Sequence, residues 1–134
     1  MKVNNNILPQ KNTIQDAAVH LYKDHNNVYY MCKISLGHSF INCIILEEDK
    51  VIEIVDIQCE TINDGIGSLM MEKLISYASE NNYCKIVGWL SIVDEEHIDR
   101  LRHFYIKHGF TIKTEYDGMK LADIELFITS RQRE

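Results

Sequence analysis

The sequence predicts one domain of the α/β (α+β) class, in which a mixed central sheet combines antiparallel and parallel strands. Three observations predict this class. Short β-rich runs with short connectors fill the first half, a helical pattern then joins two apolar runs, and a hairpin signal follows near the end. The chain has 134 residues, of which 46% are hydrophobic, enough to build a single core. We expect residues 1–134 to form one domain, with residues 1–13 as a flexible or loosely packed arm.

The first half of the chain predicts antiparallel strands. Residues 17–22 are a brief apolar run that fits either a strand or a short helix, and we favour the strand. Three longer β-rich runs follow at residues 28–36, 40–46 and 51–59. Connectors this short force consecutive strands to be antiparallel neighbours.

The middle of the chain predicts a strand, a crossover helix and a parallel strand. Apolar residues recur at helical spacing over residues 66–80, and two asparagines follow them. Residues 84–92 are almost continuously apolar, which is typical of a central strand covered on both faces. A strand, helix and strand in this order form a right-handed parallel unit.

A second helix and a hairpin complete the predicted domain. Asp94 is the expected N-cap of the second helix, and Gly109 ends it. Residues 110–116 and 119–129 then flank Asp117 and Gly118, a pair that favours a tight hairpin turn. We therefore expect a C-terminal β-hairpin at the end of the sheet.

Composition excludes several classes of protein. The formal net charge of −6 argues against nucleic acid as the main partner. No apolar run approaches the roughly 20 residues of a membrane helix, and the N-terminus lacks the apolar core of a signal peptide. Four cysteines stand singly in apolar runs, so we expect buried, reduced thiols and no metal site. The sequence predicts a soluble, cytoplasmic protein that does not bind membranes.

A glycine turn at residues 62–68 stands between the strand at residues 51–59 and the following helix. Glycines permit backbone angles closed to other residues, and a helix start offers unpaired amide donors to an anion. A diphosphate suits such a turn. Alternatively, the glycines serve only the sharp change from strand to helix.

Two landmarks in this order resemble the GNAT N-acetyltransferase superfamily. The first is the turn with Gly65 and Gly67, and the second is the end of the later helix, with Phe104 and Tyr105 followed by Gly109 and Phe110. From about residue 28 to residue 127 the order of elements is also similar to the GNAT fold. The resemblance implies acetyl-CoA as co-substrate and direct transfer of the acetyl group to a primary amine.

The resemblance also implies roles for particular residues. The first of two splayed parallel strands would present the backbone of Val55, Asp56 and Ile57 to the pantetheine arm and acetyl carbonyl. Tyr105 would contact the co-substrate and give a proton or hydrogen bond to the departing thiolate. The diphosphate would be bound by the backbone amides of Asn63, Asp64, Gly65, Ile66, Gly67 and Ser68.

The resemblance further implies that the general base is a carboxylate on one of the two splayed strands. Glu53 and Asp56 are the candidates, and a regular strand would point them to opposite faces, whereas a bulge would change that parity. On the second strand, Ser91 stands where some relatives have a glutamate. Asp94 and Glu95 are further alternatives.

Departures from the family pattern leave a second function open. Ile62 replaces the basic or amide residue that usually opens the turn, and Asp64 adds a negative charge beside the expected diphosphate. The alternative is a catalytically silent GNAT-like domain that binds CoA or a protein partner. The chain also has little room for helices before the sheet, which suggests an open acceptor site for a small amine, a protein lysine or an N-terminus. Exposed strand edges leave a homodimer open.

Overall fold

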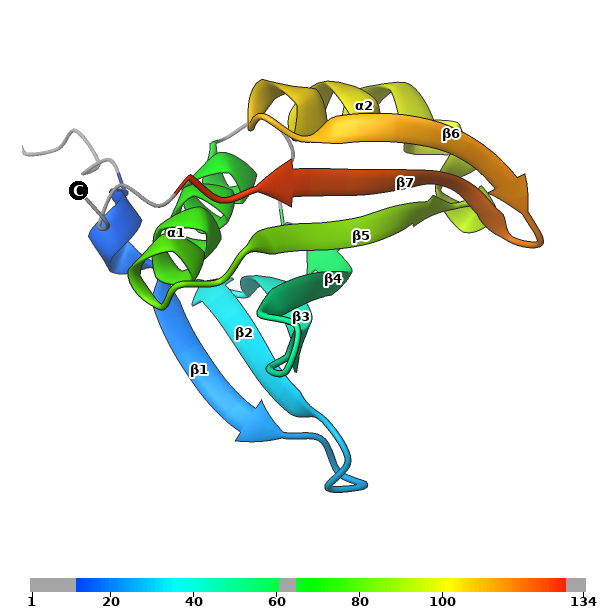
Figure 1. Ribbon diagram of the computed structural model, residues 1–134. Coiled ribbons are helices and arrows are strands. Elements are labelled where there is room, and N and C mark those ends of the chain that lie inside the picture. The colour runs from blue at the N-terminus through cyan, green and yellow to red at the C-terminus, as the bar shows by residue number, and fades with distance from the viewer. Residues whose placement is uncertain (1–11, 61–64, 130–134) are drawn as a thin grey trace, which may run out of the picture.

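The computed structural model describes residues 12–60 and 65–129, which form a seven-stranded mixed sheet with helices on one side (Figure 1). The strand order is β1-β2-β3-β4-β5-β7-β6. The elements are the 3-10 helix η1 (Ile14–Asp16), β1 (Ala18–Lys23), β2 (Tyr30–Leu36), β3 (Ser39–Leu46), β4 (Val51–Gln58), α1 (Ile66–Glu80), β5 (Lys85–Ser91), the 3-10 helix η2 (Ile92–His97), α2 (Ile98–Lys107), β6 (Thr111–Asp117) and β7 (Lys120–Phe127). The predicted fold class and order of elements are confirmed.

Strands β1 to β4 are consecutive antiparallel neighbours, as their short connectors predict. The brief apolar run at residues 17–22 forms most of β1, so the strand interpretation is correct. Alternate residues of β3 are buried, among them Ile41, Cys43 and Ile45. Cys43 lies directly opposite Cys32 of β2. This alternation shows that one face of the antiparallel half meets the core.

Helix α1 connects the parallel neighbours β4 and β5, as predicted. Its side chains Met70, Met71 and Leu74 have no solvent exposure and pack against the sheet. Burying three such side chains contributes roughly 1.5–3 kcal/mol each to folding. This apolar stripe fixes α1 on the sheet, mainly over β2 and β3.

The second helix begins differently from the prediction. Ser91, and not Asp94, is the N-cap of η2, where the Ser91 hydroxyl accepts a hydrogen bond from the Val93 amide. The Asp94 carboxylate accepts one from the Ser91 amide at 3.3 Å. This reciprocal capping box directs Asp94 back toward the end of β5.

Strand β7 lies between β5 and β6, so the C-terminal hairpin extends the sheet beyond the parallel pair. Gly118 has φ of +63°, a value that glycine adopts without strain, and it turns the chain between β6 and β7. The predicted hairpin is confirmed.

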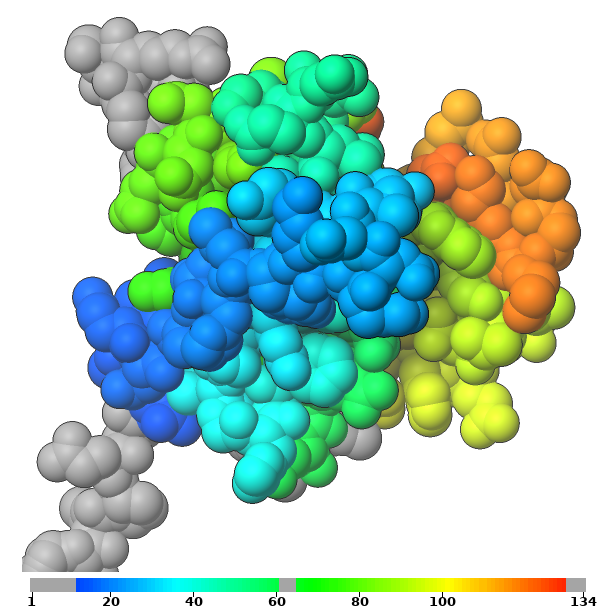
Figure 2. Space-filling model, turned by 90° about the horizontal axis from the view of Figure 1, so that it is seen from below, coloured from blue at the N-terminus to red at the C-terminus, as the bar shows by residue number. Residues whose placement is uncertain are grey.

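Within residues 12–60 and 65–129, the buried core lies on one face of the sheet. The register places Ile86 and Leu90 of β5 on the helix side, with Tyr105 of α2 in the same buried cluster. Trp89 points to the other face and is 48% exposed, so the expectation that β5 is covered on both faces is wrong. In Figure 2, which views the molecule from below, the β1–β2 hairpin, in blue to cyan, lies nearest the viewer.

The region before β2 contains no α-helix among the described residues from Asn12 onward. Within residues 12–29, the structure has η1 and β1. In the parts of the chain that the structure describes, no helix has the length and apolar character needed to cross a membrane.

The four cysteines differ in burial. Cys32 and Cys43 are fully buried in the sheet, and burial raises the pKa of the Cys32 thiol to about 11. Cys59 and Cys84 are exposed because the first follows the end of β4 and the second precedes β5. The prediction of four buried thiols is therefore wrong for two of them.

Candidate active site

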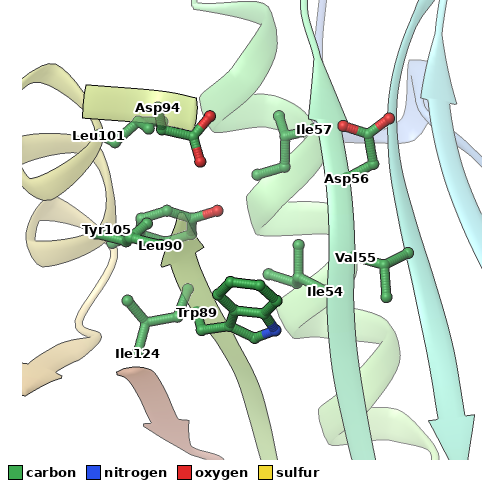
Figure 3. Close-up of a pocket in the computed structure, with 10 residues that line it drawn as sticks. All are labelled: Ile54, Val55, Asp56, Ile57, Trp89, Leu90, Asp94, Leu101, Tyr105 and Ile124. Atoms are coloured by element: carbon green, nitrogen blue, oxygen red, sulfur yellow. The ribbon is translucent and has the colours of Figure 1, made fainter. Parts of the chain in front are cut away.

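The parallel strands β4 and β5 separate after a short paired stretch. Their register runs from Val51 opposite Lys85 to Glu53 opposite Val87, and no further pairs follow. Beyond that point β4 pairs only with β3, and β5 pairs only with β7. The separation opens a cleft through the sheet (Figure 3). The predicted splayed central pair is confirmed.

A β-bulge in β4 accompanies the separation. Asp56 pairs with Asn42 of β3, whereas Ile54 pairs with the next residue, Cys43. Val55 is therefore an extra residue in β4. A bulge bends its strand and sharpens the local twist, which carries β4 away from β5.

The bulge places both predicted carboxylates of β4 on one face. Glu53 pairs with Ile44 and Asp56 with Asn42, two positions apart on β3, so all four side chains share the face away from the helices. The opposite orientation expected for a regular strand does not occur. Asp56 lines the cleft, and Glu53 lies before the separation, outside the lining.

Gly88 lies at the point where the strands part. A Cβ atom at this position would lie 3.4 Å from the carbonyl oxygen of Ile54 and 3.2 Å from Cδ1 of Ile124. A larger side chain would push β4 and β7 apart or fill the apex of the cleft. The glycine therefore permits the close approach of three strands at this apex.

The cleft is narrow, with apolar walls and few polar groups. Its volume is about 110 Å³. Its lining residues are Ile54, Val55, Asp56, Ile57, Trp89, Leu90, Asp94, Leu101, Tyr105 and Ile124. The polar side chains among them are two aspartates, one tyrosine and one tryptophan, and none of the lining side chains is basic.

Tyr105 presents its hydroxyl to this cleft from α2 (Figure 3). The residue is only 5% exposed, and its ring packs edge-on against Phe104 and Phe110 with centroids 5.4 and 5.2 Å away. Within the described ranges the hydroxyl has no hydrogen-bond partner. Burial raises the pKa of Tyr105, and the negative charges of Asp94 and Asp56 raise it further. The hydroxyl therefore remains protonated and available as a donor.

Asp94 of η2 and Asp56 of β4 are both among the lining residues of the cleft. Asp94 is half-buried on η2, and in Figure 3 its carboxylate lies beside the Tyr105 hydroxyl. Asp56 is exposed on β4 and accepts a hydrogen bond from Gln58 Nε2 at 3.3 Å. Sequence reasoning named Asp94 only as an alternative and missed Trp89, whose exposure depends on the bare face of the sheet.

The start of α1 is the expected diphosphate site. Gly65 is the N-cap, with φ of +85°, a conformation that favours glycine. Ile66, Gly67 and Ser68 form the first helical positions, where amides lack partners within the helix. The expected sites Asn63 and Asp64, together with the departure at Ile62, lie outside the described residues.

Gly67 also has a packing role that sequence reasoning missed. A Cβ atom there would lie 3.3 Å from the Phe104 ring and 3.3 Å from the Cys59 sulfur. The missing side chain therefore lets α2 approach the start of α1. Phe104 is the neighbour of Tyr105, so this contact links the position of the tyrosine to the helix start.

A hydrogen bond strengthens the same junction. His108 Nε2 and the Ser68 hydroxyl lie 3.0 Å apart, and the imidazole packs edge-on against Phe104. Burial lowers the pKa of His108, as does the neighbouring positive charge of Lys107. The imidazole is therefore mainly neutral at pH 7, so it can hydrogen-bond with Ser68 without placing a positive charge at the start of α1.

Comparisons with known proteins agree with this geometry at the level of the fold. No family model matches the sequence. The uncharacterized protein YocC of Bacillus subtilis (strain 168) is 34% identical over 94 residues, a match that covers 64% of this chain and 56% of YocC. The chain thus spans little more than half the length of this curated relative.

Solved structures of acetyltransferases share the fold over most of this chain. A GNAT-family acetyltransferase from Staphylococcus aureus Mu50 has a TM-score of 0.59 at 15% identity, over 78% of this chain and 71% of that one. A spermidine N-acetyltransferase from Vibrio cholerae, in complex with CoA and spermine, has a TM-score of 0.58 at 15% identity, over 79% and 69%. The ribosomal-protein-S18-alanine N-acetyltransferase from Escherichia coli has a TM-score of 0.55 at 16% identity, over 86% and 83%. This chain has the GNAT fold.

No cluster of histidine, cysteine, aspartate or glutamate that could hold a metal ion occurs in residues 12–60 and 65–129.

Proposed function

We propose that this protein is an N-acetyltransferase that moves the acetyl group of acetyl-CoA to a primary amine in the cytoplasm. One observation carries the proposal. A buried tyrosine hydroxyl without a partner in the described part of the chain points into the opening between two parted parallel strands. A buried hydroxyl without a hydrogen bond costs roughly 1–3 kcal/mol. Such a cost is typical of groups kept for a ligand.

The residues of the cleft fit an acyl-CoA thioester. The segment of Val55, Asp56 and Ile57 has no β5 partner, so its outward backbone groups suit the amides of a pantetheine arm. The first turn of α1 suits the diphosphate through the amides of Ile66, Gly67 and Ser68, together with the N-cap Gly65. The amides of Asn63 and Asp64, which lie outside the described residues, are further proposed diphosphate ligands. Tyr105 then faces the sulfur end of the thioester.

The proton balance of the transfer assigns a role to each polar group. An alkylammonium acceptor loses one proton before attack, and Asp94, beside the cleft, takes this proton directly or through water. The amine nitrogen then bonds to the thioester carbon, and the carbon–sulfur bond breaks. The departing thiolate accepts a hydrogen bond from Tyr105, and the second proton of the nitrogen reaches the sulfur through this hydroxyl. The products are an amide, a thiol and one released proton.

The raised pKa of Tyr105 suits a relay more than a permanent proton transfer. Thiols have pKa values of roughly 8.5, below the pKa of a tyrosine hydroxyl. A tyrosinate beside a thiol would therefore be less stable than a tyrosine hydroxyl beside a thiolate. We therefore propose that Tyr105 gives a hydrogen bond to the sulfur and recovers its proton from the new amide nitrogen.

The test is calorimetric titration of the folded protein with acetyl-CoA, with desulfo-CoA and ATP as comparison ligands. Micromolar binding of acetyl-CoA, followed by release of CoA thiol in the presence of amines, is the expected result. Binding without any transfer would favour the silent domain. Absence of binding by folded protein would overturn the assignment.

A further inference from the structure

The face of the sheet away from α1 and α2, called the bare face, carries a band of apolar side chains. Ile44 and Leu46 of β3 are half-buried on it, and Trp89 is 48% exposed. The register of the strands places six large apolar residues on this face: Met31, Ile44, Leu46, Val51, Trp89 and Phe127. A sheet normally buries such a face against a second layer, and exposed apolar surface of this kind marks an interaction site.

A row of polar residues crosses the centre of the bare face. Lys33 of β2 and Asp56 of β4 both pair with Asn42 of β3, so the three side chains share one level of the sheet. A positive charge therefore lies on one side of β3 and a negative charge on the other. The amide between them is already bonded, because the Tyr22 hydroxyl donates to Asn42 Oδ1 at 2.8 Å.

Neither charge of this row has an oppositely charged partner within the described residues. Lys33 Nζ lies 4.7 Å from the centre of the Phe40 ring, and Asp56 accepts a hydrogen bond from Gln58 Nε2 at 3.3 Å. Two strand spacings separate Lys33 from Asp56 by roughly 10 Å along the sheet. Both charges therefore stay available to a partner that covers this face.

The arrangement of the two charges is self-complementary. A half turn about an axis along β3, lying in the plane of contact, places β2 of one copy over β4 of a second copy. Lys33 of each copy then faces Asp56 of the other, and Ile44 meets its counterpart near the axis. Packed sheets lie roughly 10 Å apart, a gap that a lysine and an aspartate side chain span together.

We propose that two copies of this chain pair through their bare faces, with Ile44 and Leu46 at the centre and with Lys33 of each copy bound to Asp56 of the other. This contact uses the face of the sheet and leaves its edges free. Asp56 also lines the cleft between β4 and β5. Strand β2 of the second copy would therefore border the cleft and give it a wall on the bare face.

The first experiment is sedimentation velocity of the full chain without any cofactor, over a range of micromolar concentrations. The expected result is a species of twice the 15.7 kDa of one chain. No substrate is present, so the result does not depend on the proposed acetyl transfer. A folded protein that stays monomeric throughout would overturn the proposal and leave the bare face to a different occupant, either residues 1–11 of the chain or another protein.

Charge reversal tests the paired residues. Lys33→Glu and Asp56→Lys each turn two attractions into two repulsions, so each should raise the Kd of the dimer by roughly 30-fold or more. Arg100→Glu makes the same change in charge as Lys33→Glu at an exposed position of α2, on the other side of the sheet. This control should dimerise like the wild type.

Mixing the two single variants gives the sharpest result. In a pair formed by one Lys33→Glu chain and one Asp56→Lys chain, both contacts again join opposite charges. The equimolar mixture should therefore form a heterodimer, although each variant alone is monomeric. A chain with both substitutions should also dimerise like the wild type, and this variant needs no folded single variant.

Two further outcomes would overturn the proposal. A dimer that resists both charge reversals would place the interface elsewhere, for example at the edges of the sheet. Loss of the dimer in the single variants without recovery in the mixture or in the double variant would show that Lys33 and Asp56 do not face each other.

Discussion

Removing the Tyr105 hydroxyl should weaken catalysis and strengthen the fold. In Tyr105→Phe the ring keeps its edge-on contacts with Phe104 and Phe110 at 5.4 and 5.2 Å. The hydroxyl makes no hydrogen bond in the described part of the chain, so its removal breaks none. It also removes the cost of an unpaired buried hydroxyl, roughly 1–3 kcal/mol. The free energy of unfolding should rise by about 1 kcal/mol, a shift of about 3 °C in Tm.

The same change should lower turnover substantially. A hydrogen bond to a charged group contributes about 1.5–3 kcal/mol. If Tyr105 gives such a bond only to the developing thiolate, its loss should reduce kcat roughly 10- to 150-fold. The KM for acetyl-CoA should change little, because the bond is absent in the ground state. Release of CoA thiol measures kcat, and thermal unfolding measures stability.

Tyr83→Phe is the matched control. Tyr83 is also buried, at 7% exposure, but its hydroxyl donates to Glu47 at 3.0 Å and lies outside the cleft lining. Loss of this bond should lower stability by about 1 kcal/mol and leave kcat unchanged. A Tyr105→Phe variant that kept wild-type kcat, or that lost stability as Tyr83→Phe does, would refute the role of the Tyr105 hydroxyl.

Three further predictions concern packing, pH and thiol reactivity. Gly67→Val should lower the free energy of unfolding by roughly 1–3 kcal/mol in denaturant titration, because its Cβ would lie 3.3 Å from the Phe104 ring; unchanged stability would show that the helices separate easily. Since folding lowers the pKa of His108 from its ordinary 6.5, the unfolded chain takes up this proton first as the pH falls. Stability should therefore decline below pH 6.5 as the pH approaches the folded pKa, and His108→Gln, which preserves a hydrogen bond to Ser68, should show a smaller decline. Thiol titration of native protein should label two cysteines quickly and the buried two only after unfolding, because burial keeps the latter as thiols; rapid labelling of all four would contradict this burial. The buried thiols are Cys32 and Cys43, and the exposed thiols are Cys59 and Cys84.

Local patterns predicted the elements of this fold. Short connectors forced antiparallel neighbours, helical spacing placed α1, and the pair of Asp117 and Gly118 placed the last turn. The capping box from Ser91 to Asp94 was also present as a local signal, because serine followed three residues later by an acid marks a helix start.

Long-range register produced the features that the sequence did not predict. The bulge at Val55 appears only when β4 is aligned with β3, and it decides which face Asp56 occupies. Likewise, Gly67 is visible as a glycine, but its contact with Phe104 depends on the packing of two helices. The exposure of Trp89 follows from the bare face of the sheet, which no pattern within β5 reveals.

A crystal structure of the protein with CoA tests the central claim most directly, because it locates the sulfur relative to the cleft. We predict that the diphosphate lies at the first turn of α1 and that the pantetheine arm passes between β4 and β5. The sulfur should then lie within hydrogen-bonding reach of the Tyr105 hydroxyl, roughly 3–4 Å for a sulfur acceptor. A CoA molecule bound elsewhere, or a sulfur directed away from Tyr105, would contradict the proposed site.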